Sequence, residues 1–279
     1  MPITPEAKAQ KMKSDLPRYS NPPVVETVLS VQFAPLNGYS SAFAGRFWGL
    51  SLGKDWTKST EAPRIDDQFE RFDSQSMWMQ GVMRVSTGGQ PQRVQITSAN
   101  EDRMIQIQDS RFILNWRKQP GQTYPTYPAL SAEFLAQFRK FAEFARDAGL
   151  GNIEPNGWEL TYVNHIPKGE MWNSPEEFSK IVPGLRAVAT PDCTLETMNA
   201  DWRYTLANER GRIYASIRHV KILSTGSDAM MIQLVTRGPV SLENQHSLED
   251  GLDLGHAATA RFFTALTSAE AQAHWGREA

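Results

Sequence analysis

Apolar and polar residues alternate along several stretches of the chain, and this alternation predicts β-strands. In residues 22–33 a period of two follows two prolines and places a mostly apolar set on one face: Val25, Thr27, Leu29, Val31 and Phe33. Such runs, rich in β-branched residues, are typical of a strand with one drier face. Four further short runs are separated by turn residues and predict an antiparallel meander: 77–85, 92–99, 103–108 and 111–117.

A period near 3.6 residues replaces this alternation within residues 124–151. We expect a helix there, capped in its first turn by Ser131, ended by Gly149, and lying on a sheet through one stripe: Phe134, Phe138, Phe141 and Ala145. A short amphipathic helix fits residues 41–52. Residues 53–76 are charged and lack a sustained period, so we interpret them as a long loop.

The second half of the chain begins with another predicted strand, GWELTYVNHI, at residues 157–166. A short helix should follow, with Ser174 and Glu177 as a capping box, and then strands within 194–223 and 229–240. Two helices are expected to close the chain. The long one spans 247–266, capped by Ser247 and Asp250, and the short one spans 267–275, with Thr267 and Glu270 in the same capping relation.

Both halves therefore have one order of elements: strand, helix, several antiparallel strands, long helix. TSANED at 97–102 and TLANER at 205–210 share Thr, Ala, Asn and Glu at the same turn. We interpret this as an internal duplication. The expected fold class is α+β, with two tandem β-α-β(3-4)-α units whose curved antiparallel sheets pack on long helices. This order is similar to TATA-binding-protein-like or helix-grip folds. The expected division is a mobile arm (1–20), a first repeat (21–150) and a second repeat (151–279), packed as one body.

Composition narrows the function classes. The 279 residues carry a formal net charge of −2, so no global basic field favours nucleic acid or anionic membranes. The single cysteine, Cys193, cannot form an intramolecular disulfide. No run of apolar residues is long enough for a transmembrane helix, and the polar N-terminus lacks the apolar core of a secretory signal. We therefore expect a cytoplasmic protein that does not use a membrane.

Motifs for common chemistries are missing from the sequence. It has no GxxxxGK[ST] loop, no GxGxxG turn between strand and helix, and no GxSxG elbow. The five histidines form neither HxxxH nor HExxH, so we expect no cofactor and no metal. Asp253 lies one helical turn before His256, and we interpret the two as an exposed ion pair rather than a catalytic couple.

Four stretches in combination resemble one family: NPPVVETVLSVQF, RFILNWR followed by YPTYPAL and a Phe-rich helix, WELTYVNHI, and the C-terminal LDLGHAATARFFTAL. The chain resembles a sporadically distributed family of prokaryotic proteins of similar length with no assigned function, over residues 20 to 275. The resemblance implies a soluble protein from mobile or accessory genes. It carries no known active site over to this chain.

The candidate site residues come from the two most informative strands. In 157–166, Tyr162 and Asn164 share a face with Trp158, whereas His165 points to the other face. Asn164 would then be a buried amide that needs partners, either backbone or a bound molecule. Asn115 lies on the more polar face of 111–117, and two tyrosines of the proline-rich loop could rim the gap between sheet and helix. The ligand-binding candidates are thus Tyr162, Asn164, His165, Asn115, Tyr124 and Tyr127.

We expect a non-enzymatic binding protein that engages a protein partner or a small ligand through the sheet-helix cleft or an exposed sheet surface. The first alternative is an enzyme with Tyr162, Asn164 and His165 near its reaction centre. The second is nucleic-acid binding on the concave sheet, which basic and aromatic residues of 200–221 invite. Acidic neighbours make a solvated sheet face the simpler interpretation of this region: Arg203, Arg210, Arg212, Arg218 and Lys221 are interspersed with Glu196, Asp201 and Glu209. The oligomeric state is not predicted.

Overall fold

The structure is a computed structural model that describes residues 16–72, 92–188, 190–241 and 246–278. Within them, nine strands form one antiparallel sheet in the order β2-β3-β4-β5-β1-β6-β9-β8-β7. The strands are β1 (Val24–Phe33), β2 (Trp56–Ala62), β3 (Arg93–Ser98), β4 (Arg103–Gln108), β5 (Arg111–Arg117), β6 (Pro155–Pro167), β7 (Ala200–Thr205), β8 (Arg212–Lys221) and β9 (Asp228–Pro239). The α+β class with an antiparallel sheet is confirmed. Where the sequence predicts two sheets, the structure has one continuous sheet, with β1 and β6 at its centre.

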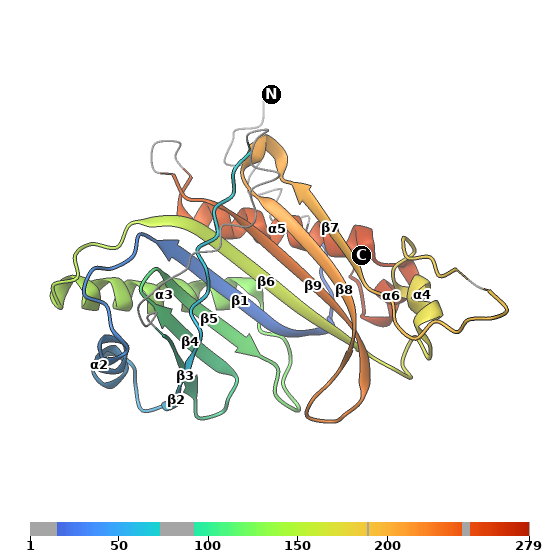
Figure 1. Ribbon diagram of the computed structural model, residues 1–279, viewed down its shortest axis with the longest axis horizontal. Helices are drawn as coiled ribbons and strands as arrows, with labels where there is room; N and C mark the ends of the chain where they lie inside the picture. The colour runs from blue at the N-terminus through green and yellow to red at the C-terminus, as the bar shows by residue number, and fades with distance from the viewer. Residues whose placement is uncertain (1–15, 73–91, 189, 242–245, 279) are drawn as a thin grey trace.

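Two long helices lie on one face of this sheet, α3 (Tyr127–Asp147) and α5 (Leu248–Leu266) (Figure 1). Shorter elements complete the described chain: α2 (Ser41–Ser51), α4 (Phe178–Ile181), α6 (Ala269–His274) and the 3₁₀ turns η2 (Pro175–Glu177) and η3 (Ala207–Glu209). Among the described residues, no helix combines the length and the apolar character needed to cross a membrane.

The helix face of the sheet carries two separate apolar clusters. The first joins β1, β3, β4, β5 and β6 to α2, α3 and Leu252 of α5, and phenylalanine rings fill much of it: Phe112 stacks on Phe141 with ring centroids 5.2 Å apart. The second lies beneath α5 and also packs α4 and α6, with Trp172 and Phe178 in edge contact at 4.8 Å. Between the two clusters lies the space that α3 and α5 leave open, which is described below.

The opposite face of the sheet is crossed by residues 63–72, which we call the strap. The strap follows β2 at one edge and runs over the central strands in front of the sheet (Figure 1). The backbone N–H of Ile65 donates to Gln108 of β4 at 3.0 Å, and that of Gln68 donates to Gln32 of β1 at 2.7 Å. The two faces therefore differ, because helices cover one and a single polar segment covers the other.

The interpretation of residues 53–76 as a loop is wrong for 56–62, which form the edge strand β2. Most of its side chains are exposed, and it is defined by backbone pairing with β3, from Trp56 opposite Ser98 to Ala62 opposite Arg93. A strand that buries neither face needs no apolar alternation. Periodicity therefore gave no signal for it.

Three predicted helix starts are also corrected. The long helix begins at Tyr127 after Thr126, not at Ser131, because Pro128 fits its first turn, where no backbone donor is needed. Ser174 makes no side-chain cap, although Glu177 does accept from the backbone N–H of Asn173 at 2.7 Å. The last helix is capped by Ser268, one residue later than expected. The Ser247 cap of α5 is confirmed, with its hydroxyl accepting from the Asp250 N–H.

Two expectations concern segments near the ends of the description. The predicted strand at 77–85 and residues 1–15 of the predicted arm lie outside the described residues. Residues 16–20 of that arm run beside the C-terminus. Tyr19 bridges Arg277, and the Ser20 N–H donates to the Gly276 carbonyl at 3.0 Å. The two ends of the described chain are thus joined.

The position of α5 depends on Trp158, whose ring lies between the helix and the sheet. A Cβ atom added to Gly255 would lie 2.7 Å from Trp158 Cζ3 and 2.7 Å from Thr236 Oγ1. Gly251, one turn earlier, and Gly238 of β9 meet the same ring. Distances this short leave no room for a side chain. The three glycines therefore allow α5 to lie directly on the tryptophan.

We expect Gly255→Ala to destabilise the protein by about 1–3 kcal/mol, because α5 or Trp158 must shift to admit the methyl group. Gly45→Ala is the matched control. Gly45 is also in a helix, but its Cβ would meet nothing within 4 Å, so this change should stabilise by about 0.5–1 kcal/mol. Urea unfolding of both variants measures the difference. Equal effects in both would show that the Trp158 contact does not hold α5.

Candidate functional site

A cavity of about 830 Å³ opens between α3, α5 and the sheet. Its floor comes from β1, β6 and β9, and its walls from the first turns of α3 and the middle of α5. Residues 16–22 and Glu278 form a further wall, where the joined chain ends close one side. Most lining groups are apolar or aromatic, among them Tyr19, Tyr124, Tyr127, Tyr162, His256 and Phe263. We call this cavity the cleft.

Hydrogen bonds join its aromatic residues into a relay. The hydroxyl of Tyr124 donates to that of Tyr162 at 3.4 Å, and the hydroxyl of Tyr162 lies 2.9 Å from Nδ1 of His256. The ring of Tyr127 stacks on the imidazole at a centroid distance of 4.0 Å, and its hydroxyl donates to Asp253 at 3.0 Å. The imidazole of His256 is therefore held in place by the stacked ring of Tyr127 on one face and by the hydrogen bond between Nδ1 and Tyr162.

Burial sets the protonation of this relay. Desolvation raises the pKa of Tyr162 well above its ordinary value, and it raises the pKa of Tyr124 and of Tyr127 as well, so all three stay protonated at neutral pH. Desolvation also lowers the pKa of His256 to about 4, against the opposing effect of the Asp253 charge. The relay is therefore neutral at physiological pH, and the hydroxyls of Tyr124 and Tyr127 act as donors.

Four of the six candidate residues line the cleft: Tyr124, Tyr127, Tyr162 and Asn164. Asn164 is a buried amide, 2% exposed, as its strand position predicts. Its Nδ2 donates to the carbonyl of Ile232 on β9 at 3.0 Å, so a backbone group satisfies this donor. Tyr127 is the first residue of α3 rather than a loop residue.

The other two candidates, Asn115 and His165, lie on the strap face, away from the cleft. Asn115 donates to Glu26 at 2.7 Å and accepts from Gln106 at 2.6 Å, which satisfies both ends of its amide. His165 is half-buried on β6, where burial lowers its pKa. The structure therefore does not bring these two residues together with Tyr162.

The sequence interpretation of Asp253 and His256 as an exposed ion pair is wrong. Both are partly buried, and each makes its hydrogen bond to a tyrosine of the cleft. The signal that could have located one of them is the pair Gly251 and Gly255, because two glycines four residues apart mark the face of a helix that approaches its support closely. At about 100° per residue, His256 follows that face around the helix, whereas Asp253 lies on the opposite side, so the glycines could have indicated only His256.

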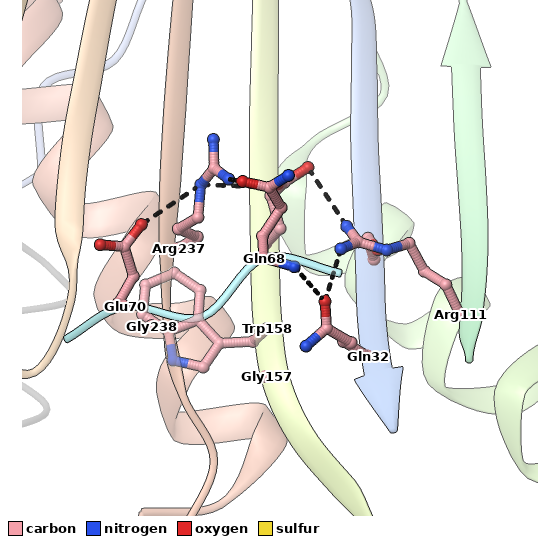
Figure 2. A pocket seen from close by; sticks show the side chains of 10 residues that line it. Gln32, Gln68, Glu70, Arg111, Gly157, Trp158, Arg237 and Gly238 are labelled. Carbon is pink, nitrogen blue, oxygen red and sulfur yellow. Dashed lines mark hydrogen bonds and ion pairs between the residues drawn. The ribbon is translucent and has the colours of Figure 1, made fainter. Parts of the chain in front are cut away.

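The strap face carries a second cavity, but polar side chains nearly fill it (Figure 2). Arg111 donates to Gln32 at 2.7 Å, and Arg237 donates to Gln68 of the strap at 2.7 Å. Glu70 of the strap pairs with Arg212 and accepts from the Tyr214 hydroxyl at 2.7 Å. The remaining volume is about 10 Å³, no more than one water needs. This network holds the strap and leaves no ligand pocket.

Metal ligands and unpaired basic residues are the other two features that could mark a site. Among the described residues, no group of three or more His, Cys, Asp or Glu side chains is arranged to hold a metal ion. Several basic residues of β8 are paired with carboxylates: Arg212 with Glu70, Arg218 with Asp201, and Lys221 with Asp228. The first two pairs reduce the positive charge that the strap face offers to an anion.

Removing the charge of Glu70 should loosen the strap. We expect Glu70→Gln to lower the free energy of unfolding by about 2 kcal/mol, because the side chain is 6% exposed and two arginines lose their charged partner. Asp147→Asn is the control, since its pair with Arg146 is exposed and should be worth under about 0.5 kcal/mol. Urea unfolding at pH 7 tests both, and an equally small loss in both would contradict the prediction.

The low pKa of His256 should make stability depend on pH. Its pKa is near 6.5 in the unfolded chain and about 4 in the native protein, so the unfolded state takes up the proton first as the pH falls. The stability contribution is complete above about pH 6.5 and should be lost between there and pH 4, on the order of 2 kcal/mol.

Carboxylates titrate in the same range, so the measurement is a comparison with His256→Phe, which lacks the imidazole. Thermal unfolding of both proteins at pH 7.5 and pH 4.5 should show the larger loss in the wild type. Identical losses in the two proteins would mean that the pKa of His256 is the same in the native and unfolded states, which would contradict the prediction.

Comparison with known proteins adds no assignment to this geometry. No protein-family model and no curated protein matches the sequence. The resemblance to a sporadic prokaryotic family therefore stays a prediction, and the function has to be argued from the cleft itself.

Proposed function

We propose that the protein binds a small, largely apolar molecule in the cleft between α3 and α5. One observation carries the proposal: a cavity of about 830 Å³ remains beside two well-packed apolar clusters. Protein interiors are normally close-packed, and ligand sites are typically concave, mostly apolar cavities of about 300–1,000 Å³ with a few placed polar groups. The cleft has this size and this composition.

A small ligand is favoured over a protein partner by the exposed surface. The large apolar side chains that the described residues expose come from five different segments: Leu50, Phe69, Val188, Tyr204 and Leu223. Scattered apolar residues are ordinary on a monomer, whereas a partner surface needs a contiguous patch. Nucleic acid is disfavoured because the strap occupies the polar face and several of its basic residues are paired.

An enzyme in the same cleft is the second candidate, and one observation favours it. His256 combines a strongly lowered pKa with a position in a cavity of about 830 Å³, and such residues are common at active sites. The two candidates differ in the fate of the ligand. A binding protein returns its ligand chemically unchanged, whereas an enzyme converts it with a rate that depends on His256.

We further propose that the chain is a duplication of one unit, β1 to α3 and β6 to α5. The strand order supports this, because β5, β4 and β3 follow β1 outward as β9, β8 and β7 follow β6. The turns predicted to correspond support it as well. Glu101 and Glu209 have φ of 59° and 54°, and each donates its N–H to a carbonyl three residues back.

A duplication predicts that the two halves of the chain are similar in sequence. In an alignment of related proteins, the part that corresponds to residues 21–150 should match the part that corresponds to residues 151–279 better than shuffled sequences match each other. A match no better than that of shuffled sequences would contradict the duplication.

Binding of N-phenyl-1-naphthylamine, an uncharged fluorophore, tests the proposed function. We expect saturable binding of one molecule per chain and at least tenfold weaker binding by Ala257→Trp, which places a large side chain in the cleft. Ala129→Trp is the control, because Ala129 is an exposed residue of α3 that does not line the cleft. No saturable binding, or equal binding by the two variants, would contradict the proposal.

A further inference from the structure

The direction of the tyrosine relay determines which hydrogen-bonding group the cleft offers. The hydroxyl of Tyr124 donates to the oxygen of Tyr162. Tyr162 still has its own proton to place, and Nδ1 of His256 at 2.9 Å is the acceptor that keeps this buried hydroxyl hydrogen-bonded. Nδ1 is then an acceptor. A neutral imidazole with an accepting Nδ1 carries its proton on Nε2.

Nε2 is the polar atom that this arrangement leaves for a ligand. It has no hydrogen-bond partner among the described residues, and it keeps contact with the open cavity. Stacking on Tyr127 holds the ring plane, so Nε2–H cannot turn toward another acceptor without breaking the Tyr162 bond. A donor in a largely apolar cleft gains most from a ligand that supplies an acceptor.

The charges around the cleft decide which acceptor fits. Among the described residues that line the cleft, four side chains carry a formal charge: Glu249, Asp253 and Glu278 are negative, and Arg18 is positive. Asp253 is the least exposed of the four, and its charge raises the pKa of both His256 and Tyr127, so it acts inside the cleft. The N-terminus of α3 adds roughly half a positive charge, which is smaller than the excess of two carboxylates. An anionic acceptor is therefore repelled.

We infer that His256 selects the ligand through Nε2–H, and that the ligand is an uncharged apolar molecule with an oxygen acceptor, such as a ketone or ester carbonyl. An ammonium group offers a second donor to Nε2–H and makes no hydrogen bond with it. A carboxylate would accept that hydrogen bond but meets the negative charge of the cleft. This inference rests on the proposed function, because it assumes that a small molecule occupies the cleft.

A matched series of naphthalenes tests the inference by displacement of N-phenyl-1-naphthylamine. The compounds share one body: 2-acetylnaphthalene is an uncharged acceptor, 2-ethylnaphthalene has no acceptor, 2-naphthoate is an anion, and 1-(2-naphthyl)ethylamine is a cation at pH 7.5. We expect 2-acetylnaphthalene to bind about fivefold more tightly than 2-ethylnaphthalene, as one neutral hydrogen bond allows. The anion should bind more weakly than the ketone.

Two variants connect this preference to His256. His256→Phe keeps a flat ring against Tyr127 and removes the donor, so the affinity of the ketone relative to that of 2-ethylnaphthalene should fall from about fivefold to about one. Tyr162→Phe removes only the hydroxyl that fixes the proton on Nε2, so it should reduce this ratio without abolishing binding. The ratio is taken within each variant, so a change in the overall affinity of the cleft does not affect it.

The failures of the two proposals are distinguishable. If the fluorophore binds but the ketone has no advantage, or the anion or the amine binds best, the inference on His256 is overturned and the proposed function stands. A ketone advantage that persists in His256→Phe overturns it as well. If neither the fluorophore nor any naphthalene binds, the proposed function fails.

Discussion

The contact between Trp158 and the glycines of α5 determines the rest of the cleft. Gly251 and Gly255 let the helix lie directly on the indole, so α5 is closer to the sheet than larger side chains would allow. Asp253 and His256 belong to the same two turns, and Tyr162 follows Trp158 by four residues on the same strand. One strand thus both supports the helix and supplies the hydroxyl that binds its histidine. The 2.9 Å bond between Tyr162 and His256 depends on this common support.

The two long helices are supported in opposite ways, and the cleft results from the difference. Bulky rings lie under α3, where Phe134, Phe138 and Phe141 form part of the first apolar cluster. Under α5, glycines take the corresponding place beside Trp158. The first apolar cluster reaches both helices, through Leu252 of α5 as well as the rings under α3, yet a space remains between them that tyrosines and a histidine line. The open cavity lowers stability, because the side chains around it lack the van der Waals contacts that a filled core would provide. Such a loss is expected where a site serves binding rather than stability.

Alternation predicted most of the sheet, and it also predicted correctly that Tyr162 and Asn164 share a face with Trp158. That prediction required only the period of two. The cleft itself was not predictable from local pattern, because Tyr162 meets His256 across 94 positions of sequence. The exposed strand β2 gave no pattern, since backbone pairing with β3 forms it. The first turn of α3 was missed because two prolines suggest a loop, although a helix start tolerates them.

The partner of Nδ1 decides the chemistry of His256. If a carboxylate stood at the position of the Tyr162 hydroxyl, it would accept a proton from Nδ1, favour the charged imidazole and turn Nε2 of the neutral ring into an acceptor. Tyr162 does the reverse, because its own oxygen already accepts from Tyr124. The nearest carboxylate, Asp253, is bound by the hydroxyl of Tyr127. Burial therefore keeps the histidine neutral, and in the arrangement that we infer Tyr162 turns its proton toward the cleft, so that residues which need not touch the ligand determine what the cleft can bind.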